Sequence, residues 1–144
     1  MSLHRRPVLL LLAAVALFAG CAGGSPEDRL ALRMFTDHYT FRISPTPVPP
    51  HAREKTRYKV VVRDKETGQP IEGGEGIIYA NTRDGASTWD TFVPGQELGT
   101  YYATLNFVVS GEWAMGLRFR RDSTQRLEQV DWMQEVLAER AGIP

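Results

Sequence analysis

The chain has 144 residues, of which 17 are basic and 17 are acidic, so its formal net charge is zero. The charges are scattered along the sequence, which argues against the clustered positive surface that nucleic-acid binding requires. The chain contains one cysteine, and this excludes an intrachain disulfide.

The N-terminal residues have the three-part layout of a secretory signal. A head with two arginines is followed by an apolar run over residues 8–18 and by two small residues that precede Cys21. This order is typical of a signal peptide, and the run is shorter than the roughly 18–20 residues that a membrane-spanning helix needs. We expect residues 1–20 to be removed, which leaves 124 residues (144 less 20), enough for one domain with a substantial core.

Residues 18–21, Phe-Ala-Gly-Cys, resemble the lipobox of bacterial lipoproteins, in which Leu usually stands where this chain has Phe18. The resemblance implies that a diacylglycerol is attached to the sulfur of Cys21 and that fatty acids such as palmitate complete the anchor. Several acyl chains hold a protein stably in a membrane, because each buried methylene contributes about 0.8 kcal/mol. Ala22 is not the Asp that retains some lipoproteins in the inner membrane, which favours the periplasmic side of the outer membrane.

The region between the predicted anchor and the predicted fold is short. Residues 21–38 are expected to hold the lipid anchor and a polar tether, and residues 39–140 are expected to form one domain. Within the tether, residues 29–35 fit either a short helix opened by residues 25–27 or the lead into a strand.

From residue 39 onward, apolar residues alternate with polar ones, which is the period of a half-buried strand. Turn residues separate the alternating stretches, and the pairs Asp84-Gly85 and Ser110-Gly111 are typical of tight hairpins. We expect strands over residues 39–43, 57–64, 76–82, 88–93, 101–109 and 112–120.

Residues 44–50 contain four prolines. Proline lacks the N–H group that a central strand donates to its neighbour. We interpret this segment as an extended edge or a crossover, a rigid spacer rather than a recognition peptide, because it lies inside the domain.

Residues 128–137 are ambiguous. Their apolar residues fit a helical spacing of three to four, and they also fit an alternating strand through Val130, Trp132 and Val136. Local propensity favours a helix, but a sheet that needs a neighbour beside residues 112–120 favours the strand. We expect a strand.

Seven short strands with frequent turns and no long helix between them predict an all-β fold, an immunoglobulin-like antiparallel β-sandwich. The hairpin of residues 101–120 carries the largest apolar side chains, and we expect it to form the middle of the core. Short helices at the two ends are compatible with this fold.

Three motifs resemble the YtkA-like and FixH-like domains, which are small bacterial sandwiches. Those domains carry a V-x-V-x-D-x-x-T-G-x-P-I turn, a G-x-Y strand start and a G-x-W strand start. The corresponding residues here are Asp64, Thr67, Gly68 and Pro70, then Gly99 and Tyr101, and then Gly111 and Trp113. The resemblance spans residues 39–137. It implies the sandwich fold and a role in assembling copper-containing respiratory oxidases, although FixH-like members usually have a transmembrane helix where this chain has a lipobox.

No set of residues in the sequence has the pattern of a catalytic site, and we expect a protein that is not an enzyme. The two histidines beyond the signal, His38 and His51, accompany no recognisable nucleophile. Copper favours imidazole and thioether ligands, so Met34, His38 and His51 are the residues that could form a small copper site. The alternative is that Met34 packs in the core and both histidines lie on the surface.

Arg118 and Arg120 occupy alternate positions of the strand expected over residues 112–120, so they project from one face of the sheet. Sandwiches commonly meet their partners through exposed sheet faces and edges. The sequence therefore predicts a lipid-anchored, non-catalytic binding module of the bacterial cell envelope, with no cofactor other than the covalent lipid. Its partner would be an envelope protein that contacts Arg118 and Arg120. The alternative function is a copper-handling accessory of respiratory-oxidase assembly.

Overall fold

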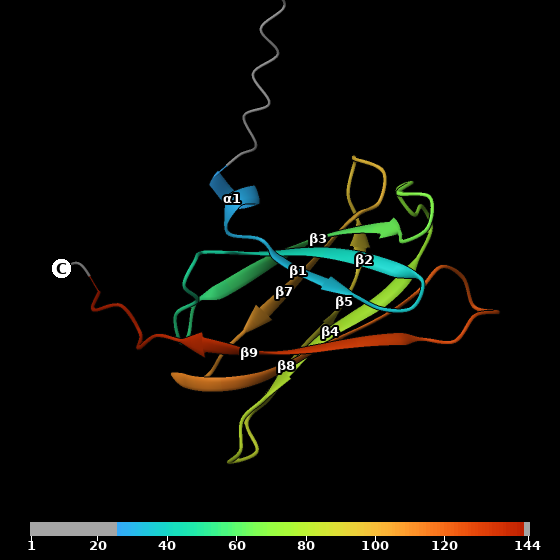
Figure 1. Cartoon of the computed structure of the whole chain (residues 1–144). Helices are drawn as coiled ribbons and strands as arrows, with labels where there is room; N and C mark the ends of the chain where they lie inside the picture. The colour runs from blue at the N-terminus through green and yellow to red at the C-terminus, as the bar shows by residue number, and fades with distance from the viewer. Residues whose placement is uncertain (1–25, 143–144) are drawn as a thin grey trace, which may run out of the picture.

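The computed structural model describes residues 26–142 and consists of two antiparallel sheets packed face to face (Figure 1). One sheet has the strand order β1-β2-β3-β7-β6, and the other has the order β5-β4-β8-β9. This architecture confirms the predicted all-β, immunoglobulin-like sandwich. The predicted signal peptide and Cys21 lie outside the described residues. The elements are α1 (Pro26–Arg29), β1 (Leu32–Phe35), β2 (Tyr39–Thr46), β3 (Lys55–Asp64), β4 (Glu75–Asn81), β5 (Ser87–Thr91), β6 (Val93–Pro94), β7 (Thr100–Asn106), β8 (Gly111–Arg120) and β9 (Glu128–Val136).

Buried and more exposed residues alternate along the long strands. The inward side chains of both sheets therefore form the core. Phe119 is the centre of an aromatic cluster, and its ring centroid lies 5.1 Å from that of Tyr39 and 5.5 Å from that of Tyr101. Every described strand and every residue of the buried core lies within residues 32–136. A chain that begins at residue 22 therefore retains the whole fold.

The N-terminal segment contains both of the structures that its sequence allowed. α1 is a single helical turn, and β1 follows it as an edge strand that pairs with residues 40–43 of β2. β1 falls inside residues 21–38, the segment expected to serve as anchor and tether. The folded sheet therefore begins at Leu32, ahead of the domain start expected at residue 39.

The proline-rich segment divides between a strand and a crossover. β2 continues through Pro45 to Thr46, and residues 47–54 then cross to the start of β3. Pairing of β2 with β1 stops at Ile43. At Pro45 the strand has a neighbour on one side, and a proline is tolerated there as it is on an edge strand.

The ambiguous C-terminal segment is a strand, as expected. β9 pairs with β8 from Gly111↔Val136 to Phe119↔Glu128. Val130 and Val136 are buried in the core. This ladder and the burial of the two valines outweigh the local preference of the sequence for a helix.

The strand expected over residues 88–93 is divided between the two sheets. β5 pairs with β4, whereas β6 pairs with β7 in the other sheet. Phe92 stands between them, and its ring is stacked at 5.9 Å from that of Tyr101. This change of sheet, together with β1, raises the number of strands from the expected seven to nine in the described chain.

α1 lies on the outer side of the five-stranded sheet. In Figure 1 it stands above this sheet, with the four-stranded sheet below, and it contacts β2. Ser44 fits this placement, because it alternates with the buried Ile43 and so projects outward from β2, yet it is only 6% exposed. Among the described residues, no helix is long and apolar enough to span a membrane.

Candidate functional site

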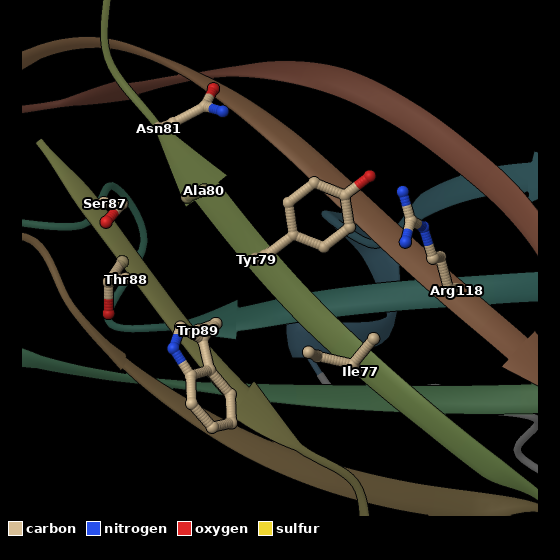
Figure 2. A pocket seen from close by; sticks show the side chains of 8 residues that line it. All are labelled: Ile77, Tyr79, Ala80, Asn81, Ser87, Thr88, Trp89 and Arg118. Carbon is tan, nitrogen blue, oxygen red and sulfur yellow. The ribbon is translucent and has the colours of Figure 1, made fainter. Parts of the chain in front are cut away.

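The outer face of the four-stranded sheet carries an exposed tryptophan. Trp89 in β5 is 65% exposed, and it lies directly across the β4–β5 ladder from Tyr79. Both residues border a shallow hollow of about 400 Å³ (Figure 2). We name this surface the aromatic face and define it by Ile77, Tyr79, Asn81, Ser87, Trp89 and Arg118.

The ring of Tyr79 lies over a glycine of the neighbouring strand. Gly116 in β8 pairs with Tyr79, and a Cβ atom at Gly116 would stand 2.2 Å from the end of the Tyr79 ring. The glycine therefore leaves the room in which the ring rests on the backbone of β8. This contact fixes the direction of the ring across the sheet.

Arg118 lies beside the same ring. Its guanidinium carbon is 5.3 Å from the centroid of Tyr79, and its Nε donates a hydrogen bond of 2.8 Å to Oε1 of Gln129 in β9. These two contacts hold the cationic group at the rim of the hollow, and the side chain stays exposed.

Arg120, the second residue of the predicted partner face, projects from the same side of β8. Its Nη2 lies 2.9 Å from Oε2 of Glu75 in β4, and its side chain is 28% exposed. Arg118 therefore lines the hollow, whereas Arg120 is held in an ion pair two positions further along the strand.

The sequence predicted the strands that carry Trp89 and Tyr79 but did not single out either residue. Both stand in alternating strands, where an aromatic residue is as easily part of the core as of the surface. Their outward direction follows from the pairing of β4 with β5 and with β8. No local sequence signal reports that pairing.

His38 lies in the turn between β1 and β2 and contacts a carboxylate that is distant in sequence. Its Nδ1 is paired with Glu128 at the start of β9, and its backbone N–H donates to the same carboxylate at 3.2 Å. Burial raises the pKa of Glu128, but hydrogen bonds from Thr36 and His38 lower that pKa below its ordinary value. Glu128 thus stays a negatively charged partner for the imidazole, whose side chain is 75% exposed.

The structure does not bring the three predicted copper ligands together. His38 and His51 lie at opposite ends of the eight-residue strand β2, which separates them by roughly 25 Å. The Nδ1 of His51 bonds to the carbonyl of Ala138 at 2.9 Å, and Met34 is half-buried in β1 and packs against the core. In the part of the chain that the structure describes, no three His, Cys, Asp or Glu side chains are grouped so as to hold a metal ion.

Comparison with known proteins shows the fold but no family. No protein-family model matches the chain, and no curated protein matches its sequence. The likeness to YtkA-like and FixH-like domains therefore stays a resemblance of motifs. Among solved structures, a DUF4426 family protein from Pseudomonas aeruginosa is similar with a TM-score of 0.60 at 11% identity, over 78% of this chain and 98% of that one.

Two structures of FetP from uropathogenic E. coli strain F11 are also similar. The as-isolated protein, expressed in the periplasm of E. coli, has a TM-score of 0.55 at 11% identity and covers 74% of this chain and 93% of its own. A copper-bound variant of FetP has a TM-score of 0.54 at 10% identity and covers 79% of this chain and 96% of its own. At these identities the likeness concerns the fold alone.

Proposed function

We propose that this chain is a non-catalytic binding module of the bacterial cell envelope, held to a membrane by lipid at Cys21, and that it binds a protein partner through the aromatic face. The observation that carries the proposal is Trp89, which is 65% exposed in the middle of a regular strand. Exposed apolar surface that is concentrated in one place is typical of interaction sites.

The composition of the aromatic face suits a protein partner. Trp, Tyr and Arg are enriched among the residues that dominate the binding energy of protein interfaces. Trp89, Tyr79 and Arg118 border one hollow and are carried by three different strands of one sheet. Because the strands hold these residues before binding, little ordering is needed when the partner arrives.

The envelope location rests on the sequence of the N-terminal segment. The signal layout and the lipobox support export and lipidation, and Ala22 supports the periplasmic side of the outer membrane. The similar fold of FetP, which was expressed in the periplasm, is compatible with this location.

Photo-crosslinking in cells tests the partner face. A benzoylphenylalanine at Ser87, which belongs to the aromatic face, is expected to give one discrete adduct with an envelope protein. Trp89→Ala is expected to abolish this adduct and to leave the unfolding midpoint nearly unchanged, because most of the indole faces solvent. The same photoreactive residue at Glu66, in the exposed turn after β3, is the control and is expected to give no such adduct. An adduct that persists in Trp89→Ala would contradict the proposal.

Copper handling is the second candidate, and the copper-bound structure of a similar fold favours it. His38 is the imidazole best placed for it, because it is exposed and lies beside the carboxylate of Glu128. A titration of residues 22–144 with Cu(I) and Cu(II) tests this function. Binding that is lost in His38→Asn and kept in His51→Asn would support it, and equal binding by both variants would count against a site at His38.

A further inference from the structure

Basic side chains cover the outer face of the five-stranded sheet. Alternate residues of β3 point away from the core, and the register of β1 with β2 sets Arg33 beside Arg42 on the same side. No acidic residue occupies an outward position on β1, β2, β3, β6 or β7 of the described chain. We name this surface the basic face and define it by Arg33, Arg42, Lys55, Arg57, Lys59 and Arg63.

Nearby acidic groups do not cancel the charge of the basic face. Asp90 and Glu97 line a hollow with Arg57 at the β6–β7 edge, and α1, whose sequence is Pro-Glu-Asp-Arg, adds two acidic residues and one basic residue. Together with the basic face, these residues number seven basic and four acidic, a net charge of +3. Residues 22–144 carry 15 basic and 17 acidic residues in total, a net charge of −2. The rest of residues 22–144, without the residues counted above, therefore has a net charge of −5.

The basic face also exposes an aromatic ring. Phe35 of β1 lies across from Thr40, on the outward side, and it is 62% exposed. Basic residues are attracted to anionic lipid headgroups, and aromatic rings favour the boundary between headgroups and acyl chains. This combination suits a lipid surface.

The chain enters the fold on the same side. α1 lies on the outer side of the five-stranded sheet (Figure 1), and Cys21 precedes Pro26 by five residues. Five residues span at most about 18 Å. A lipid at Cys21 would therefore hold this side of the sandwich close to the membrane.

We propose that the basic face docks on the anionic headgroup layer of the membrane. The four-stranded sheet is the opposite layer of the sandwich, so this orientation turns the aromatic face away from the lipid and toward a partner. The docking goes beyond the proposed function, because it assigns a role to a second face that does not touch the first.

Vesicle binding by residues 22–144 without lipid tests the proposal. The chain is expected to bind vesicles of phosphatidylcholine mixed with phosphatidylglycerol, and to bind pure phosphatidylcholine only weakly. Lys55→Gln with Lys59→Gln is expected to lower the partition coefficient roughly 25-fold, because each basic residue near an anionic surface contributes about five-fold. Trp89→Ala is expected to leave vesicle binding unchanged, which separates this test from that of the proposed function.

The matched control removes the same charge elsewhere. Arg83→Gln with Arg120→Gln changes one exposed residue in the turn after β4 and one residue on the outer side of β8, both in the four-stranded sheet. This pair is expected to alter binding by no more than about two-fold, because charges beyond about 10 Å are screened. Equal losses in the two double variants would overturn the proposal, as would equal binding to both kinds of vesicle. Binding to a soluble polyanion without binding to vesicles would overturn the choice of a lipid surface.

Discussion

Gly99 occupies a position that a residue with a side chain can take only under strain. Its φ of +74° lies in the left-handed region. A Cβ atom there would stand 2.8 Å from the carbonyl oxygen of Val62 and 2.7 Å from Cβ of Pro70. The backbone N–H of Val62 also donates to the carbonyl of Gly99 at 2.7 Å. β3, the loop after it and the start of β7 therefore meet at this glycine.

Replacing Gly99 by alanine is expected to lower the free energy of unfolding by about 2–4 kcal/mol, from backbone strain and from overpacking against Pro70. Gly68→Ala is the matched control, since its φ is +73° but nothing lies within 4 Å of the added atom. The control is expected to lose about 1–2 kcal/mol. Urea unfolding measures both losses, and equal losses would show that the close contact at Gly99 costs nothing.

Asp64 organises the turn that follows β3. Its Oδ1 accepts hydrogen bonds from the backbone N–H groups of Glu66 and Thr67 at 3.0 and 2.9 Å, and Arg121 donates to its Oδ2. The bond from Thr67, and then the bond from Arg121, lower the pKa of Asp64 from 3.8 to about 2. The carboxylate thus explains why an Asp begins the turn motif seen in the sequence.

The free energy of unfolding is expected to fall as the pH falls from about 4 to about 2. A carboxyl group whose pKa is lower in the folded state stabilises the fold above its unfolded pKa, and that stabilisation is lost as the pH drops through the folded pKa, here about 2. Asp64→Asn keeps an acceptor for the turn and removes the titrating group, so its stability should change less over this range. Asp84→Asn, in the turn after β4, is the control. If the free energy of unfolding changes with pH by the same amount in the wild type and in Asp64→Asn, this prediction is contradicted.

At the scale of elements, the packing of β4 against β8 shapes the aromatic face. Gly116→Ala is expected to displace the ring of Tyr79 and to weaken crosslinking from Ser87, because the added methyl group takes the space of the ring end. The loss of stability should stay below about 2 kcal/mol, since a side-chain end can move aside. Ala114→Ser, at the preceding outward position of β8, is the control. NMR shifts of Tyr79 that are unchanged in Gly116→Ala would contradict the prediction.

The elements that could be predicted are those whose alternation is unbroken. In β8, Trp113, Leu117 and Phe119 are all fully buried, as the period of two required. β9 carried two competing periods, and only its ladder with β8 decides between them. β6 has two residues, too few for any periodicity, so the change of sheet at Phe92 could not be predicted.

At the scale of the whole molecule, strand pairing decides which residues share a surface. Lys55, Arg57 and Lys59 alternate with apolar or neutral residues and form no basic block in the sequence, yet they share the basic face with Arg33 and Arg42 through the registers of β1, β2 and β3. The reverse holds for the predicted copper ligands, which are near one another in sequence: Met34 and His38 lie near the start of β2, and His51 is separated from them by the length of that strand. Proximity along the sequence therefore fails to predict the basic face, and it wrongly predicts that the three copper ligands lie together.

The two membrane attachments are expected to differ in their response to salt. Acyl chains at Cys21 hold through apolar burial, which salt does not weaken, so the full-length protein should leave the membrane fraction only in detergent. Residues 22–144 exported behind a signal without the cysteine should attach through the basic face alone. High salt should release this chain, because the Debye length falls from about 10 Å at 0.1 M to about 3 Å at 1 M. Lys55→Gln with Lys59→Gln should be released at lower salt still. Release of the full-length protein by salt alone would contradict lipidation at Cys21, and retention of the cysteine-free chain at high salt would show an attachment other than the basic face.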